Sequence, residues 1–166
     1  GRQAKVGFYS LETSPAKLTN RIVAGRAFID FGRINRREMT QEEWERIVRL
    51  KQEIAESDIE LVPASGWSVQ DVLSCALQRR HKIVFIDYLQ QLQGRGRDRF
   101  EQVTRISLDL HAMAQAHGIM VVALSQFSRA SAARDGEPTL TDLRESGQIE
   151  HDADAVLALY INEDES

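Results

Sequence analysis

The segment Lys82-Ile83-Val84-Phe85-Ile86-Asp87 decides how this sequence folds. Its continuous run of apolar, mostly β-prone residues predicts a short strand in the interior of a sheet. A strand that is apolar throughout is typical of a parallel sheet with helices on both faces. Asp87 then lies just at the carboxyl end of that strand, where open α/β sheets bind their ligands.

Strand-like and helix-like segments alternate on both sides of this segment. Other short apolar runs predict strands over 5–11, 59–62, 119–124 and 155–161. Apolar residues at helical spacing predict helices over 15–27, 40–54, 68–77 and 100–116. The helix starts carry capping residues, namely Ser14 or Thr13, Thr40 with Glu43, and Ser68. This alternation predicts an α/β fold, a mostly parallel β-sheet flanked by helices, in a single domain over residues 1–166.

Composition sets further limits. The 166 residues are 42% hydrophobic and 28% charged, which is ordinary for one globular domain. Cys75 is the only cysteine, so an intrachain disulfide is excluded, and its apolar neighbours predict a core position. No apolar run approaches the ~20 residues needed to span a bilayer, and no signal peptide is apparent. We therefore expect a cytoplasmic protein without membrane partners.

Polar side chains follow three of the predicted strands. Asp87 is placed to hold Mg²⁺ of a bound nucleotide, usually through water. Glu12 could orient and deprotonate a water molecule, and Gln126 could contact a γ-phosphate. Each also has a plainer interpretation, as a turn-capping Asp, an exposed Glu near a helix start and a loop amide. Their occurrence at three strand ends favours a nucleotide site.

A phosphate-binding loop of the form G-x-x-x-x-G-K-[ST] is absent from the sequence. The segment Gly94-Arg95-Gly96 is no substitute, because it lacks the Lys-Ser/Thr pair and belongs to a basic loop. The residues alone therefore predict weak or absent ATP binding by this chain.

The segment Arg144-Glu145-Ser146-Gly147 follows a long polar connection. An arginine beside a glycine suits contact with a nucleic-acid backbone, although a helix-start turn with a surface arginine is the alternative. The acidic residues that follow, with His151 among them, favour a solvated or structural segment over a metal site. Trp44 and Phe100 are expected in the core.

Together these residues resemble the C-terminal motor domain of DnaB-like bacterial replicative DNA helicases. The matching stretches are Phe8-Tyr9-Ser10-Leu11-Glu12, Leu18 with Arg21, Ile86-Asp87-Tyr88-Leu89-Gln90, Ala123-Leu124-Ser125-Gln126, and Asp142-Leu143-Arg144-Glu145-Ser146-Gly147-Gln148-Ile149-Glu150-His151-Asp152-Ala153-Asp154. The last stretch is the most specific. The resemblance implies a RecA-like fold, here a truncated P-loop NTPase core.

The resemblance also implies roles for individual residues. Glu12 matches the glutamate that activates the hydrolytic water, Asp87 the Walker B aspartate that holds Mg²⁺, and Gln126 the residue that senses the γ-phosphate of ATP. Arg144, Glu145 and Gly147 match the loop that grips the phosphate backbone of single-stranded DNA. Family members form hexameric rings, bind ATP between subunits and move along single-stranded DNA.

This sequence departs from the family pattern at its two termini. The family's phosphate-binding loop precedes the position of Gly1, and its arginine finger follows that of Ser166. We therefore expect a piece of a helicase that is inactive by itself. A non-enzymatic RecA-like binding or assembly module is the alternative. A different RecA-like ATPase, such as a recombinase, is disfavoured by the Arg144-to-Asp154 stretch.

Overall fold

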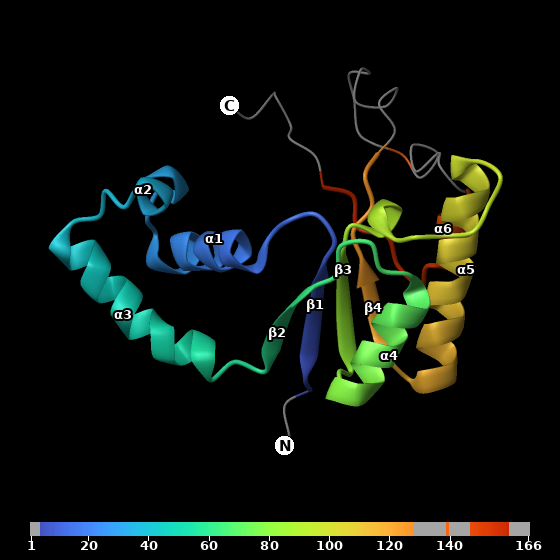
Figure 1. The fold of residues 1–166 in the computed structure, drawn as a ribbon, viewed down its shortest axis with the longest axis horizontal. Coiled ribbons are helices and arrows are strands. Elements are labelled where there is room, and N and C mark those ends of the chain that lie inside the picture. Colours follow the sequence, from blue (N-terminus) through green and yellow to red (C-terminus); the bar gives the residue numbers. More distant parts are fainter. Residues whose placement is uncertain (1–3, 128–138, 140–146, 160–166) are drawn as a thin grey trace.

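The computed structural model describes residues 4–127, 139 and 147–159. Its centre is a four-stranded parallel sheet in the order β2-β1-β3-β4. The strands are β1 (Val6–Ser10), β2 (Ile59–Pro63), β3 (Ile83–Asp87) and β4 (Met120–Ala123). The helices are α1 (Pro15–Ala27), α2 (Phe31–Arg36), α3 (Gln41–Ala55), α4 (Val69–Arg79), α5 (Arg99–His117) and α6 (Gly147–Asp152), with a short 3₁₀ turn, η1, at Leu89–Gln91. The predicted parallel α/β sheet flanked by helices is confirmed (Figure 1).

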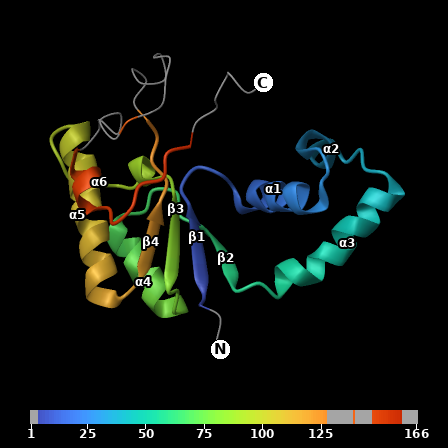
Figure 2. The same ribbon diagram turned by 180° about the vertical axis from the view of Figure 1, so that it is seen from behind.

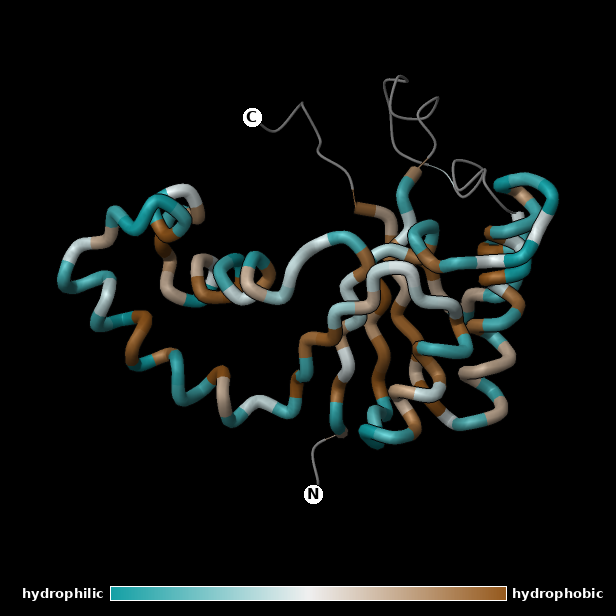
Figure 3. Tube along the Cα trace, in the orientation of Figure 1, coloured by the Kyte–Doolittle hydropathy of each residue, from teal (hydrophilic) through white to brown (hydrophobic). Residues whose placement is uncertain are grey.

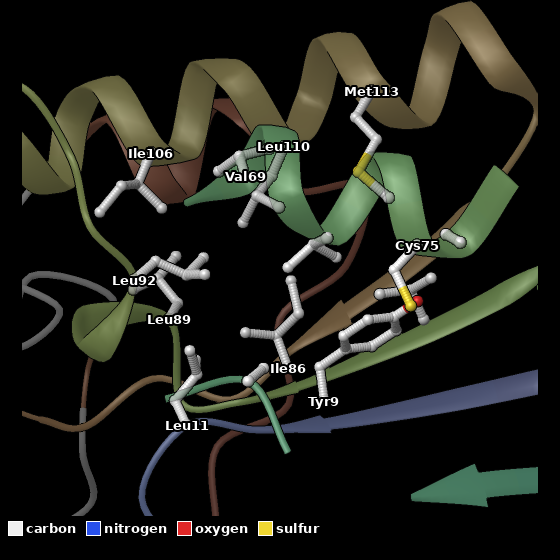
Figure 4. Packing of buried hydrophobic residues seen from close by; sticks show 14 of the residues in the cluster. Tyr9, Leu11, Val69, Cys75, Ile86, Leu89, Leu92, Ile106, Leu110 and Met113 are labelled. Carbon is white, nitrogen blue, oxygen red and sulfur yellow. The ribbon is translucent and has the colours of Figure 1, made fainter. Parts of the chain in front are cut away.

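Helices α4 and α5 cover one face of the sheet and form the main core with it (Figure 4). Tyr9 and Ile86 of the central strands are fully buried there, against Val72 of α4 and Ile106 of α5. Cys75 lies in the same core, as predicted. On the opposite face the rings of Phe8 and Phe85 stack with centroids 6.1 Å apart, and both remain half-buried. Within the described residues, the expected burial of the strands is therefore achieved on one face only.

Helices α1 to α3 form an arm that extends away from the sheet (Figures 1 and 2). The arm has a small core of its own, made by Ala24, Ala27, Ile29 and Ile34. The predicted caps are confirmed: Ser14 accepts a hydrogen bond from the backbone of Lys17, and Thr40 and Glu43 form a capping box. Colouring by hydropathy shows that apolar residues are concentrated in the strands, while the arm alternates between polar and apolar segments (Figure 3).

Three expectations from the sequence were wrong. Trp44 and Phe100 are not core residues, because their side chains are 50% and 57% exposed. The strand expected over 155–161 does not form over its described part, 155–159, where Leu157 and Leu159 are almost fully exposed; residues 160 and 161 lie outside the described residues. An apolar run becomes a strand only where another strand offers it hydrogen bonds, and 155–159 pairs with no strand of the described sheet.

A chain of polar contacts runs from buried Tyr9 through buried His81 to the half-exposed Glu60. The Tyr9 hydroxyl lies 2.9 Å from Nδ1 of His81, and Nε2 of His81 lies 3.0 Å from a carboxylate oxygen of Glu60. A Cβ on Gly7 would collide with this imidazole, so only glycine leaves room for it. With a neutral imidazole, Nδ1 accepts from Tyr9 and Nε2–H donates to Glu60, so both ring nitrogens are satisfied. Arg79 pairs with the same carboxylate and offsets its charge.

This arrangement predicts a pH-dependent stability. Burial, assisted by the positive charges of Arg79 and Lys5, lowers the pKa of His81. The unfolded chain, with a histidine pKa of about 6.5, therefore takes up a proton at a higher pH than the folded chain does. The contribution of His81 to the free energy of unfolding is fully present above about pH 7 and is lost as the pH falls below about 6.5.

Urea unfolding measured between pH 5 and 8 checks this expectation. The difference between the wild-type chain and His81→Gln should shrink towards low pH. His117→Gln changes an exposed histidine at the end of α5 and should keep the wild-type profile. A wild-type profile that His81→Gln leaves unaltered would contradict the assignment.

Candidate nucleotide and DNA site

The carboxyl ends of β1 and β3 are fixed side by side. Ser10 pairs in register with Asp87, and one residue further the Leu11 N–H donates to the Asp87 carbonyl over 3.0 Å. Glu12 follows directly. Parallel pairing therefore brings two of the carboxylates predicted from the sequence to adjacent exits on the same edge of the sheet.

The turn that carries Glu12 is built by its neighbours. The Ser10 hydroxyl donates to the Thr13 carbonyl over 2.7 Å and accepts from the Thr13 N–H over 3.2 Å. Leu11 is buried, and Ser14 caps α1 immediately afterwards. Between these fixed points Glu12 is exposed. A carboxylate held by a rigid turn, yet open to solvent, is suited to hold a water molecule.

Asp87 ends β3 and is half-buried. Magnesium prefers oxygen ligands and is commonly held by one or two carboxylates together with waters and substrate phosphates. The carboxylate of Asp87 at the sheet edge fits such a role. Among the described residues there is no group of three His, Cys, Asp or Glu side chains that could enclose a metal ion by themselves.

Gln126 lies beyond the end of β4 and is exposed. Its backbone is held by Gln90, a buried residue of η1, whose side chain contacts both the N–H and the carbonyl of Gln126. From the sequence, Gln90 was assigned no role. The only local signal was its place in the stretch that follows Asp87, where Gln90 and Gln91 separate Leu89 from Leu92.

The predicted DNA-binding residues are described only in part. Arg144 and Glu145 lie outside the described residues, whereas Gly147 is the first residue of α6. Helix α6 is anchored on α5, since the buried Ser107 donates to the Asp152 carboxylate over 2.7 Å. His111 Nδ1 lies 3.0 Å from the Asp152 carbonyl and donates to it. Asp152, one of the acidic residues noted in the sequence, thus has a structural role.

Glu12, Asp87 and Gln126 therefore follow the carboxyl ends of three neighbouring strands, which open on the same edge of the sheet. A base for water, a ligand for a hard cation and an amide are the groups expected for hydrolysis of a nucleoside triphosphate. Within the described parts of the chain, no helix combines the length and apolarity needed to cross a membrane.

Comparison with known proteins identifies the family of this chain. The family model for the DnaB-like helicase C terminal domain matches residues 1–166. The replicative DNA helicase DnaB of Rickettsia typhi is 38% identical over 165 residues, and the match covers 95% of this chain and 33% of that protein. A probable plasmid replicative DNA helicase of Chlamydia trachomatis is 34% identical over 171 residues, covering 99% of this chain and 38% of that protein. The chain thus spans about a third of the length of these curated relatives.

Solved structures give the same result. One solved ATPase domain superimposes with a TM-score of 0.84 at 36% identity, covering 91% of this chain and 57% of that one. A DnaB-like replicative helicase, solved in a study of its interactions with primase, superimposes with a TM-score of 0.83 at 36% identity, covering 91% of this chain and 39% of that one. By sequence and by fold, the chain belongs to the DnaB-like helicase C-terminal domain family.

Proposed function

We propose that this chain is part of the motor of a replicative DNA helicase, which couples ATP hydrolysis to movement along single-stranded DNA and to duplex unwinding. The observation that carries the proposal is that Glu12, Asp87 and Gln126 follow the carboxyl ends of three neighbouring parallel strands, in a chain of this family. Its relatives are named as replicative helicases. A RecA-like module without hydrolysis would need none of these three side chains.

Glu12 is proposed as the catalytic base. The hydrogen bonds between Ser10 and Thr13 hold the backbone of the turn that carries Glu12, and its exposed carboxylate would accept a proton from the water that attacks the γ-phosphate. The turn leads directly into α1, whose N-cap is Ser14.

Asp87 would hold Mg²⁺ through water, and a bound Mg²⁺ neutralises phosphate charge during phosphoryl transfer. The register with Ser10 sets the position of this carboxylate relative to the turn of Glu12. Gln126 is proposed to contact the γ-phosphate, and its exposed side chain lies three residues beyond the end of β4.

Arg144, Glu145 and Gly147 are proposed to contact the phosphate backbone of single-stranded DNA. The described part that supports this is α6, which starts at Gly147 and is docked on α5. We further propose a hexameric ring with ATP between subunits, acting in the cytoplasm. Phosphate contacts of this kind weaken with rising salt concentration.

The whole protein that carries this domain tests the catalytic assignment. Glu12→Gln keeps the shape of the side chain and removes the base, so kcat for ATP hydrolysis should fall by roughly 10²–10⁴-fold. Binding of nucleotide and single-stranded DNA should persist. Steady-state ATPase assays and fluorescence anisotropy measure the two properties.

Glu42→Gln is the matched control, because Glu42 is an exposed glutamate on the arm, in α3. It should hydrolyse ATP like the wild type. A fully active Glu12→Gln protein would rule out Glu12 as the base, and a wild-type protein without ATPase activity would favour a non-enzymatic module.

The docking of α6 gives a second prediction. Ser107→Ala removes the hydroxyl that holds the Asp152 carboxylate, a hydrogen bond to a charged group worth about 1.5–3 kcal/mol. Amide hydrogen exchange over Gly147–Asp152 should accelerate, and affinity for single-stranded DNA should decrease. Ser74→Ala removes an exposed hydroxyl that bonds only within α4 and should change neither property. Unaltered exchange in α6 would show that Ser107 does not anchor it.

A further inference from the structure

Gln90 joins two segments that are 36 residues apart in the sequence. Its Nε2 donates to the Ser125 hydroxyl over 2.8 Å and to the Gln126 carbonyl over 3.3 Å. Its Oε1 accepts from the Gln126 N–H over 3.4 Å. The side chain therefore contacts both backbone polar groups of Gln126, as a neighbouring strand would.

The position of these contacts explains what they do. Regular pairing between β3 and β4 ends at Ile86 with Ala123. Beyond it, the Leu124 N–H donates to the Ile86 carbonyl, and the Leu89 N–H donates to the Leu124 carbonyl, each over 2.9 Å. The carboxamide of Gln90 continues this pairing after the strands have ended, and so fixes the backbone of Gln126.

The backbone of Gln90 is held from the other side. The guanidinium of Arg99, the first residue of α5, donates to the Gln90 carbonyl. Gln90 thus connects the segment that follows β4, through its side chain, with the first residue of α5, through its carbonyl. The same helix, two turns further along, holds α6 through Ser107.

We propose that Gln90 is a positioning residue that sets the orientation of Gln126 at the nucleotide edge and ties it to the start of α5. The inference rests on the proposed role of Gln126 in ATP hydrolysis. Gln90 itself is 6% exposed and contacts the backbone of Gln126, so it acts through that residue. An apolar side chain of similar size would leave the N–H and the carbonyl of Gln126 without these partners.

The structural part of the proposal is tested in the 166-residue chain, without nucleotide. Gln90→Leu should accelerate hydrogen exchange at the Gln126 amide by about tenfold, as expected for the loss of a single hydrogen-bonding partner. Gln90→Glu keeps an acceptor for the Gln126 N–H and should give an intermediate rate. Gln91→Leu is the matched control, since the side chain of this exposed neighbour bonds only to the Tyr88 hydroxyl. Unchanged exchange in Gln90→Leu would overturn the proposal.

The functional part is tested by DNA-stimulated ATP hydrolysis in the whole protein. Gln90→Leu should lower kcat by about tenfold, matching the change in exchange, while KM for ATP stays near the wild-type value. Adding Gln126→Ala to Gln90→Leu should lower kcat no further than Gln126→Ala alone, because both changes remove the same function. Gln91→Leu should remain at wild-type activity.

The outcomes distinguish the positioning role of Gln90 from the proposed role of Gln126 in ATP hydrolysis. Additive effects of Gln90→Leu and Gln126→Ala, or a fall in kcat for Gln90→Leu without faster exchange at Gln126, would overturn the positioning role. Full activity of Gln126→Ala would overturn the proposed role of Gln126, and with it the functional part, while the exchange result would still establish the contact.

Discussion

The parallel pairing of β1 with β3 is the constraint on which the rest of the structure depends. It sets Ser10 opposite Asp87 and continues by one hydrogen bond from the Leu11 N–H to the Asp87 carbonyl, so the turn of Glu12 begins beside the end of β3. The same register turns Tyr9 and Ile86 into the core beneath α4 and α5. A slip by one residue would reverse the faces of β1. Core and candidate site are therefore specified by one set of hydrogen bonds.

Local signals in the sequence were sufficient for most elements of the fold. Apolar runs predicted all four strands, and hydroxyl residues at helix starts predicted the caps of α1, α3 and α4, because these preferences act within a few residues. Tertiary context decided the cases that were wrong. Trp44 lies on the amphipathic helix of an extended arm with little to pack against, and the apolar residues 155–159 pair with no described strand. Helix α2 was overlooked because only its cap, Asp30, marks so short a helix.

In the candidate site, too, some residues could be predicted from local sequence signals and others depend on tertiary contacts. Glu12, Asp87 and Gln126 could be selected from the sequence because parallel strands deliver their carboxyl ends to one edge. Gln90 could not be selected, since its importance comes from contacts with Ser125 and Gln126, which no spacing rule connects with it. The spacing of apolar residues along the sequence does not reveal buried polar side chains whose partners are distant in the sequence. Such side chains nevertheless fix the backbone that carries the exposed site residues.

Helix α5 unites the two halves of the site in physical terms. At its first residue, Arg99 holds the Gln90 carbonyl, and further along Ser107 and His111 hold Asp152 of α6. A helix rises about 1.5 Å per residue, so Arg99 lies roughly 12 Å along the axis of α5 from Ser107 and roughly 18 Å from His111. The segment that carries Gln126 and the helix that begins at Gly147 are thus fastened to the same rigid element. The anchoring groups on α5 are all polar. Separating either segment from α5 would break these hydrogen bonds, which costs free energy because the groups are at least partly buried. The two segments are therefore expected to move together with α5.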